Sequence, residues 1–433
     1  MENRMLDIKA RVLVVGGGGR EHAIVDALSR SAKVGKIYCA PGNAGIAAQA
    51  ECVPLKDTDV DGLLAFAREK AIDLTVVGPE AALAVGIVDR FRAAGLKIFG
   101  HTKAATAIES SKEFAKELMF RHRVPTASYC TFRNFSQALA YVRAGSLPTV
   151  VKYDGLAAGK GVVVAATLEE AEAALRDMLL DGRYGEGKVI IEDFLTGPEF
   201  SLMAFVSGRQ VAPMVCAQDH KRAYDGDEGP NTGGMGAYTE SFAAGRSGLS
   251  FISDADYGFA VTKILQPVAD AMADAGTPLT GVLYGGLMKT PSGIKVIEFN
   301  ARFGDPETEV VLPRLETDSY DVFEAVACGG PIPELRWRDE SVLGVVLASK
   351  GYPGSYEKGA PIVIAPEFSE RLYHMGTRQA DDGRLQTAGG RVLMAVASAP
   401  ATPEAARRCY AGVSRIECDN LFYRSDIAKY VLK

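Results

Sequence analysis

The sequence predicts a multidomain protein that combines α/β and α+β architecture. A chain of 433 residues is too long for one ordinary domain. Strands and helices alternate at its start, whereas later parts mix strands and helices around glycine-rich loops. We therefore expect a doubly wound parallel domain over residues 1–111, an α+β core over residues 112–330 and a small α+β domain over residues 331–433.

The composition is that of an average soluble globular protein, with hydrophobic residues at 47% and charged residues at 24%. Its net charge of −6 argues against a general nucleic-acid binder. The 7 cysteines are scattered without a C-x-x-C pair, which favours reduced thiols in a cytoplasmic protein and indicates no zinc site. The only apolar run near the start, residues 12–15, is too short for a signal sequence or a membrane span. We expect a cytoplasmic protein with neither nucleic-acid nor membrane partners.

The first domain begins with a strand, a glycine loop and a helix. These are residues 11–15, 16–19 and 20–30, and the pattern continues with strands at 36–40, 73–78 and 97–100 and helices at 59–70 and 82–94. Such alternation predicts a parallel sheet with helices on both faces. The glycine loop and the helix start would direct backbone N–H groups at an anion.

The glycine loop does not fit a dinucleotide. In G-x-G-x-x-G the third glycine would fall on Glu21 when counted from Gly16, and on His22 when counted from Gly17. The second strand also ends at residues 39–41 without an acid that could hold a ribose. We therefore expect no nicotinamide cofactor. The loops 41–45 and 78–80 lie at the carboxyl edge of the sheet, where they are either ligand-binding loops or ordinary turns.

A second glycine-rich loop follows a strand in the core. A helix expected over residues 102–122 carries Lys112, and a strand at 149–153 leads into the loop 154–161, where glycines flank Lys160. Glycines allow backbone N–H groups to approach phosphates closely. The spacing is G-x-x-x-G-K-G without a following hydroxyl, so this is no Walker loop, and a solvated hairpin turn is the alternative. A strand at 162–166 and a helix opened by a Thr167 and Glu170 capping box come next.

The most polar loop of the chain, residues 219–236, follows strands at 188–195, 200–207 and 210–218. A charged stretch is often only a solvated face. Here opposite charges, an amide, a hydroxyl and three glycines lie in one loop, a combination that suits a small zwitterion or a phosphate.

The stretch 296–307 predicts a metal site. A helix at 254–275 and a strand at 280–289 precede it. Residues two apart in a strand share a face, so Ile297 and Phe299 should face the core while Glu298 and Asn300 face the other way. Their oxygens suit Mg²⁺, which takes few protein ligands. Arg302 should lie on the same side, and an edge strand with a polar outer face is the alternative.

The last domain shows little chemistry. Helices over residues 308–328 close the core, and Pro331 and Pro333 indicate a linker. Strands at 341–350 and 391–397, a turn at 352–354 and a helix at 403–415 follow. We interpret this domain as packing or as a wall of the site.

Seven motifs in one order resemble the phosphoribosylamine-glycine ligase (glycinamide ribonucleotide synthetase) family of purine synthesis, which belongs to the ATP-grasp enzymes. They are G-G-R-E-H-A at 18–23, A-P-G-N-A-G at 40–45, V-G-P-E at 77–80, D-G-L-A-A-G-K-G-V at 154–162, D-H-K-R at 219–222, G-P-N-T-G-G-M-G-A-Y at 229–238 and F-N-A-R-F-G-D-P-E-T at 299–308. The resemblance implies an ATP-grasp core of two α+β subdomains with a mobile lid at about residues 125–196.

The resemblance also implies a ligand for each group of residues. ATP would be held by Lys112, Lys152, Gly155, Gly159, Lys160, Gly161, Glu192, Phe194, Leu195 and Glu199. Mg²⁺ or Mn²⁺ would be held by Glu298 and Asn300. The small-molecule substrates glycine and 5-phosphoribosylamine would be bound by Gly18, Gly19, Arg20, Glu21, Pro41, Gly42, Asn43, Gly78, Pro79, Glu80, Asp219, Lys221, Arg222, Asn231, Thr232, Gly233, Gly234 and Arg302. Arg302, Lys152 and Lys160 would be catalytic, with Gly233 and Gly234 helping Arg302 to steady an oxyanion.

The implied reaction joins glycine to 5-phosphoribosylamine through a glycyl phosphate and yields ADP and phosphate. Positioning and charge neutralisation carry such a reaction, so we expect no Ser-His-Asp nucleophile. We also expect a monomer, although the sequence does not give the oligomeric state. Two alternatives remain: an ATP-grasp ligase with another acid or amine, and a nucleotide sensor without turnover. Three departures from the family pattern are the first ten residues, which extend beyond the usual start, His101 after Gly100 and the bulky Tyr153 beside Lys152.

Overall fold

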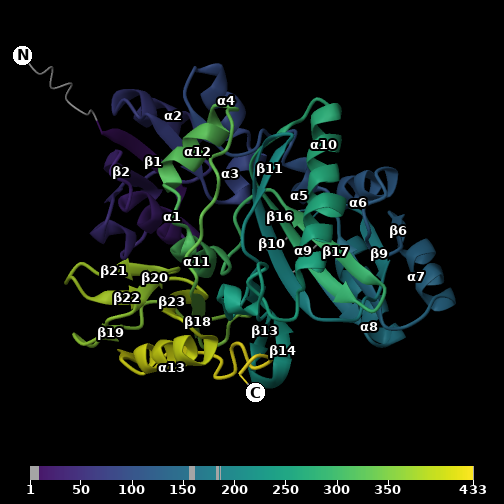
Figure 1. Ribbon diagram of the computed structural model, residues 1–433. Helices are drawn as coiled ribbons and strands as arrows, with labels where there is room; N and C mark the ends of the chain where they lie inside the picture. Colours follow the sequence, from purple (N-terminus) through teal and green to yellow (C-terminus); the bar gives the residue numbers. More distant parts are fainter. Residues whose placement is uncertain (1–8, 156–160, 182–184, 186, 433) are drawn as a thin grey trace, which may run out of the picture.

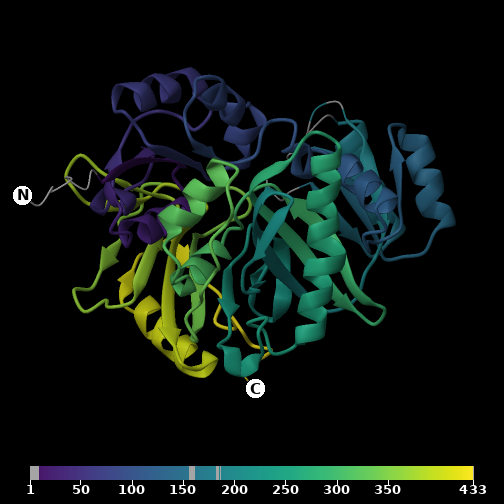
Figure 2. The same ribbon diagram turned by 45° about the horizontal axis from the view of Figure 1, so that its top comes forward.

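The computed structural model describes residues 9–155, 161–181, 185 and 187–432. Within this part of the chain, four main sheets surround two adjoining cavities. The first unit, the central sheet, a small outlying sheet and the C-terminal unit are seen from two directions in Figures 1 and 2. None of the described helices has the length and hydrophobicity that a membrane span requires.

The first unit is the predicted doubly wound parallel sheet. Its strand order is β3-β2-β1-β4-β5. The strands are β1 Ala10–Gly16, β2 Val34–Pro41, β3 Glu51–Cys52, β4 Leu74–Val77 and β5 Ile98–Phe99, and the helices are α1 Gly19–Ser29, α2 Val60–Glu69, α3 Glu80–Ala84 and α4 Ile87–Ala93. The single helix expected over 82–94 is wrong, because Gly86 has a φ of 88° and separates two helices.

A second expected helix is also interrupted. Residues 102–122 form α5 Ala107–Ser110 and α6 Lys112–Arg121, because Ser111 has extended backbone angles and its hydroxyl accepts a hydrogen bond from the Phe114 N–H. Ser111 is therefore the N-cap of α6. This cap places Lys112 at the first residue of a helix that lines the inner of the two cavities.

The small sheet has the antiparallel order β6-β9-β7-β8. Its elements are β6 Tyr129–Phe132, α7 Phe135–Ala144, β7 Thr149–Tyr153, β8 Val162–Ala165, α8 Leu168–Leu179 and β9 Val189–Asp193. The predicted capping box of Thr167 and Glu170 opens α8. Tyr153 is buried in the core of this unit and its ring contacts the backbone positions of Gly155 and Gly187, so most of its bulk is accommodated there.

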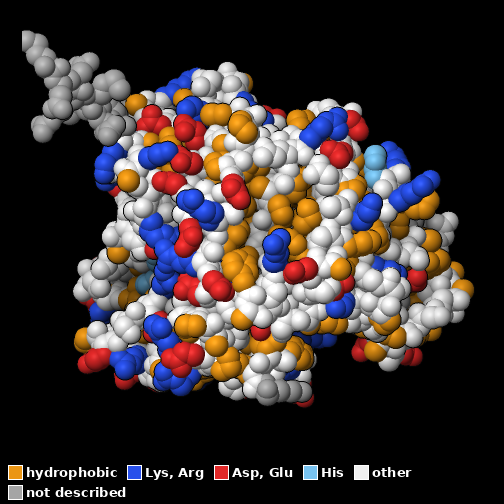
Figure 3. Space-filling view, viewed as in Figure 1, with side chains coloured by type: hydrophobic (Ala, Val, Ile, Leu, Met, Phe, Trp, Pro, Cys, Tyr) orange, Lys and Arg blue, Asp and Glu red, His pale blue; other side chains and the backbone are white. Residues whose placement is uncertain are grey.

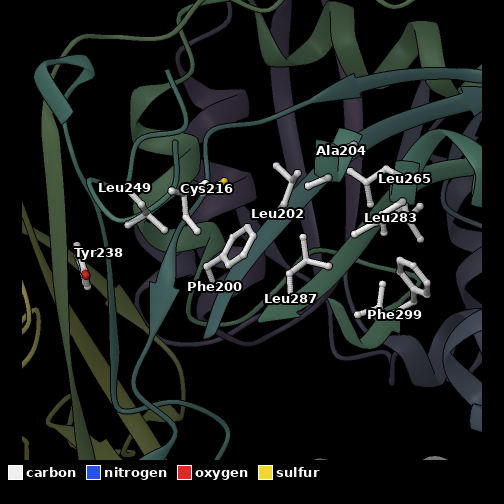
Figure 4. Packing of buried hydrophobic residues seen from close by; sticks show 14 of the residues in the cluster. Phe200, Leu202, Ala204, Cys216, Tyr238, Leu249, Leu265, Leu283, Leu287 and Phe299 are labelled. Carbon is white, nitrogen blue, oxygen red and sulfur yellow. The ribbon is translucent and has the colours of Figure 1, made fainter. Parts of the chain in front are cut away.

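The large central sheet is antiparallel, with the order β11-β10-β16-β17. Its strands are β10 Glu199–Gly208, β11 Gln210–Pro213, β16 Leu279–Thr290 and β17 Gly293–Asn300. One long helix, made of α9 Asp254–Phe259, a π-helical turn Ala260–Leu265 and α10 Gln266–Asp274, packs on one face. Figure 4 shows Leu283 of the sheet beside Leu265 of this helix, and Phe200, Leu202 and Leu287 of the sheet belong to the same buried cluster. The apolar packing makes β10, β16 and β17 a fixed base for polar side chains on the opposite face.

The C-terminal sheet includes strands from the middle of the chain. Its order is β12-β15-β18-β23-β20, with β25 paired to β18. The strands are β12 Gln218–Asp219, β15 Gly236–Thr239, β18 Ser341–Ser349, β20 Arg371–His374, β23 Arg391–Ala399 and β25 Leu421–Phe422, covered by α13 Thr402–Val413. The strand expected over 210–218 is wrong, since the chain leaves the central sheet after Pro213. The polar loop 219–236 is therefore held at both ends by the C-terminal sheet.

Smaller elements complete the structure. The helices α11 Thr308–Val311 and α12 Ser319–Ala327 follow the central sheet, and three two-stranded pairs join β13 Arg222–Tyr224 to β14 Glu228–Asn231, β19 Val363–Ile364 to β24 Ile416–Glu417 and β21 Thr377–Gln379 to β22 Leu385–Thr387. On the face in Figure 3, acidic and basic side chains lie next to one another rather than in one broad field of a single sign.

Candidate active site

Two adjoining cavities lie where the small sheet faces the large sheet. The inner cavity is about 130 Å³ and the outer cavity about 830 Å³. Both are lined by Lys152 of β7, Glu192 of β9 and Glu298 of β17. The polar side chains predicted to bind ATP and a metal are therefore brought to one place by strands of two different sheets.

A β-bulge in β17 decides which side chains enter these cavities. Glu298 pairs with Gly286 of β16 but Val296 pairs with the next residue, Leu287, so Ile297 is an extra residue in the strand. Val296 and Phe299 are both buried in the core. The expectation that Ile297 faces the core is wrong, because the extra residue shifts the alternation and Ile297 lines both cavities. The predicted faces of Glu298, Phe299 and Asn300 are as expected.

Glu298 and Asn300 fit a hard divalent cation. Burial raises the pKa of Glu298, but the charges of Lys221, Lys152, Lys112 and Arg302 together outweigh it, and its pKa is lowered. The amide of Asn300 satisfies both polar atoms when its nitrogen faces Glu109 Oε1 at 3.2 Å. An ionised carboxylate and an amide oxygen are donors that Mg²⁺ and Mn²⁺ accept.

Three lysines converge on the inner cavity. Lys152 Nζ lies 2.9 Å from Glu192 Oε1 and donates to the Ile297 carbonyl at 3.0 Å. Lys112 Nζ donates to the Gly155 carbonyl at 3.0 Å. The third is Lys116, which the sequence reasoning missed. It is buried, and its Nζ lies 2.9 Å from Glu192 Oε2.

Lys116 had a usable signal in the sequence. It stands four residues after Lys112 on the same helix, and such residues share a face. Burial lowers the pKa of Lys116 to about 8, against the opposing charge of Glu192. Glu192 thus bridges two ammonium groups, and its predicted contact with ATP stays a prediction.

Arg302 links the inner cavity to the first unit. Its Nη2 lies 3.0 Å from Glu109 Oε1 and its Nε lies 3.2 Å from Glu80 Oε2. Burial raises the pKa of Glu80, but Arg302 and Arg20 lower it to about 2. Glu109 also escaped the sequence reasoning, because nothing in its helix distinguishes it from a surface carboxylate. The guanidinium of Arg302 is therefore fixed by two carboxylates from two different helices, α3 and α5.

The glycine loops of the first unit form one edge of this region. Gly18, Gly19, Pro41, Gly42, Gly78 and Pro79 follow the carboxyl ends of β1, β2 and β4. Glu21 accepts from the Gly18 N–H at 2.6 Å and pairs with Arg20 at 2.7 Å. A Cβ on Gly78 would lie 2.0 Å from Glu21 Oε1, so only glycine fits there. Asn43 donates to the carbonyls of Gly17 and His374, which ties the loop to the C-terminal unit.

The polar loop borders the outer cavity. Its predicted substrate residues Asp219, Lys221, Arg222, Asn231 and Thr232 line this cavity, as do Phe194, Leu195 and Glu199. Lys221 Nζ lies 2.7 Å from Glu199 Oε2. Burial raises the pKa of Asp219 to about 7, with Lys221 opposing the shift and Glu307 adding to it.

The predicted glycines of the polar loop and of the phosphate loop differ in what the structure describes of them. The N–H of Gly233 donates to the Tyr352 hydroxyl and that of Gly234 to the Thr232 hydroxyl, both at 2.9 Å. Both donors are thus used within the protein, and the expected role of these glycines in steadying an oxyanion stays a prediction. In the phosphate loop, Gly155 and Gly161 line the inner cavity, whereas Gly159 and Lys160 lie outside the described residues.

Comparison with family models gives three consecutive matches. The N domain of phosphoribosylglycinamide synthetase matches residues 10–109, its ATP-grasp (A) domain residues 110–308 and its C domain residues 342–430. The phosphoribosylamine-glycine ligase of Halalkalibacterium halodurans is 51% identical and that of Salmonella typhimurium 47% identical. The first alignment covers 96% of both chains, and the second covers 96% of this chain and 97% of the relative.

Solved structures agree with these relatives. The crystal structure of phosphoribosylamine-glycine ligase from Thermotoga maritima has a TM-score of 0.82 at 30% identity and covers 96% of this chain and 100% of its own. Biotin carboxylase from Campylobacter jejuni has a TM-score of 0.72 at 13% identity, covers 96% of this chain and 93% of its own, and shares the fold alone. The family models and the full-length relatives agree, so the chain belongs to the phosphoribosylamine-glycine ligase family of ATP-grasp enzymes.

Proposed function

We propose that this chain ligates glycine to 5-phosphoribosylamine, forming glycinamide ribonucleotide, ADP and phosphate in purine biosynthesis. The observation that carries the proposal is the meeting of three parts at the two cavities. Lysines from the small sheet and α6, an ionised Glu298 from the central sheet and Arg302 held by Glu80 of the first unit all reach this region. Family membership supports ATP as the phosphoryl donor.

ATP is proposed to lie across both cavities. Phe194, Leu195 and Glu199 line the outer cavity, which has the size of a nucleotide site, and would contact the base and the ribose. Lys112 and Lys152 lie toward the inner cavity and would hold the phosphates. The unit of the small sheet and its helices α7 and α8, within residues 125–196, is proposed to close over the bound nucleotide as a lid.

Glu298 and Asn300 are proposed to hold Mg²⁺ or Mn²⁺ together with the phosphates of ATP. When bound, such a cation would neutralise charge on the transferred phosphoryl group. The neighbouring lysines keep Glu298 ionised at neutral pH, so proton loss is not needed for it to serve as a ligand. The two donors are few, as is usual where phosphates and water complete the coordination.

The two remaining substrates are proposed to reach Arg302 from opposite sides. Phosphoribosylamine would lie along the loops of Gly18–Glu21, Pro41–Asn43 and Gly78–Glu80, with its phosphate near the start of α1. Glycine would lie near Asp219, Lys221 and Arg302. A carboxylate oxygen of glycine attacks the terminal phosphorus of ATP and displaces ADP, and the amine of phosphoribosylamine then attacks the acyl carbon of the glycyl phosphate and expels phosphate. Arg302, fixed by Glu80 and Glu109, would stabilise the charge on the acyl oxygen.

The proposal is tested by ADP formation with each substrate left out in turn. ADP release should require glycine, and amide formation should require phosphoribosylamine. Efficient turnover of another acid or amine in a substrate panel would favour a different ATP-grasp ligase, and ATP binding without turnover of any substrate would indicate a nucleotide sensor. The free cysteines among the described residues support the proposed location in the cytoplasm.

Lys152 and Lys160 should contribute to different steps. Lys152 lies on a strand between the cavities, so Lys152→Ala should weaken ATP binding by about 10-fold or more, as expected for loss of a charged hydrogen-bond donor. Lys160 belongs to the glycine-rich loop of the sequence, so Lys160→Ala should mainly slow closure and turnover. Calorimetric titration with ATP would separate the two. Intact affinity in the first variant and lost affinity in the second would reverse the assignments.

Lys116→Met should raise the KM for ATP by about 5- to 10-fold, because Glu192 would then attract Lys152 alone and draw its ammonium group from the phosphates. Methionine keeps much of the volume of lysine, so the thermal midpoint should change little by comparison. Lys103→Met, at an exposed position, is the matched control. Equal KM values for both variants would remove Lys116 from the site.

A further inference from the structure

The C-terminal segment, residues 424–431, is held against the hairpin of β13 and β14. In Figure 1 the end of the chain lies beside these two strands. Arg424 is fully buried, with its Nη2 2.9 Å from Asp227 Oδ1 and its Nε 2.7 Å from Asp426 Oδ1. Its Nη1 also donates to the Arg222 carbonyl at 3.1 Å. The guanidinium of Arg424 thus joins the segment to the turn between β13 and β14 and to β13 itself.

The attachment is reciprocal. The N–H of Gly226 in the hairpin turn donates to Asp426 Oδ2 at 2.9 Å, and the N–H of Ser425 in the segment donates to Asp225 Oδ1 at 2.8 Å. Lys429 Nζ lies 2.8 Å from Asp227 Oδ2. A backbone N–H on each side donates a hydrogen bond to a carboxylate on the other, so the hairpin and the segment are fixed relative to each other.

This attachment places two side chains at the outer cavity. Tyr430 and Val431 line it beside Arg222 and Asp227 of the hairpin. The Tyr430 hydroxyl hydrogen-bonds to Asp227, and its ring stacks on His220 with centroids 6.2 Å apart and planes at 20°. Tyr430 is 53% exposed, and Lys429 Nζ lies over its ring, 5.1 Å from the centroid. An aromatic ring that is held by His220 and Asp227, in a residue that stays partly exposed at the cavity, is suited to contact a ligand.

We propose that Tyr430 and Val431 form the outer wall of the nucleotide site and contribute directly to ATP affinity, with Arg424 as the residue that positions them. The inference rests on the proposed function in one respect, that ATP occupies the outer cavity. It gives the C-terminal unit a direct contact with the nucleotide. Apolar area covered by the ligand would stabilise the bound state, and loss of the ring would speed ATP release more than it slows chemistry.

The test compares two nearby tyrosines, Tyr430 of the segment and Tyr423 just before it. Tyr430→Ala should weaken ATP binding in calorimetry and raise the KM for ATP, each by about 5- to 10-fold, while kcat stays within about 2-fold. Tyr430→Phe keeps the ring and should bind ATP within about 2-fold of the unaltered chain. Tyr423→Ala is the matched control, since Tyr423 is similarly exposed at 46% and does not line the cavity.

The possible results distinguish the wall assignment from the proposed function. If Tyr430→Ala binds ATP as tightly as the unaltered chain, the wall assignment is wrong while the proposed function stands. If the unaltered chain binds no ATP, the proposed function itself fails. Should Tyr430→Ala not fold, Val431→Ser removes the second wall residue with less disturbance, and an unchanged KM for ATP in that folded variant would equally overturn the inference. Equal losses of affinity in Tyr423→Ala and Tyr430→Ala would show a general effect on the C-terminal part of the chain and would overturn the inference as well.

Discussion

Glu298→Gln should lower ATP-dependent ligation by roughly 100-fold or more, as for loss of a principal electrostatic contact. Glutamine keeps the shape of the side chain but removes its charge. Lys221, Lys152, Lys112 and Arg302 would then face an uncharged amide, and the divalent cation would lose its only charged protein ligand among the residues assigned to it. The measurement is ADP release at saturating ATP over a series of Mg²⁺ concentrations.

The control for this variant is Glu316→Gln, an exposed carboxylate later in the chain. Both variants should show cooperative thermal unfolding, which separates a lost ligand from a lost fold. Turnover that stays unchanged in saturating Mg²⁺ would rule out Glu298 as the metal ligand. Turnover that is low but returns fully at high Mg²⁺ would assign Glu298 to metal affinity alone and contradict the expected loss at saturation.

Glycine labelled with oxygen-18 in its carboxylate should transfer one label to inorganic phosphate per turnover, with ADP as the other product. Among the described residues, the lining of the inner cavity includes no serine, threonine or cysteine that could accept an acyl group. On the proposed path no protein side chain is acylated, so the activated species is glycine itself, whose carboxylate oxygen forms the new bond to the terminal phosphorus while ADP leaves. That oxygen leaves with the phosphate when the amine attacks. Mass spectrometry of the released phosphate measures the transfer.

The same path makes a prediction for Arg302. Arg302→Ala should lower kcat far more than it weakens ATP binding, because the guanidinium acts on charge that develops when the amine attacks. Its two carboxylate partners, Glu80 and Glu109, would lose their shared cation, so the thermal midpoint should be measured alongside.

In the isotope experiment, unlabelled phosphate, or release of AMP and pyrophosphate, would refute the path through glycyl phosphate and indicate an adenylating ligase.

The sequence predicts local features well where one segment carries the whole signal. The parallel first sheet, the capping box of α8 and the faces of Glu298 and Asn300 follow from alternation and from side-chain capping within a few residues. The helix breaks at Gly86 and Ser111 were missed because apolar periodicity continues across them, and only the backbone angles reveal the interruption. Lys116 was missed because its importance depends on Glu192, which lies on a distant strand.

Features that depend on distant pairing could not be predicted. β12 and β15 join a sheet whose other strands begin a hundred residues later, since the register of such strands is set by tertiary packing rather than by their own residues. For the same reason the last domain was interpreted as packing or a wall without a choice between them. The contact of Arg424 with Asp227 spans about half the chain and leaves no local pattern.

The extra residue in β17 separates what the sheet needs from what the site needs. Without Ile297, Val296 and Glu298 would become neighbours and alternate normally, with Phe299 still inward and Glu298 still outward, opposite the same partners in β16. A shorter chain could therefore build the same hairpin. It would lack the carbonyl that receives Lys152 and the apolar side chain shared by both cavities. The central sheet could thus form without Ile297, whereas the two cavities in their present form depend on it.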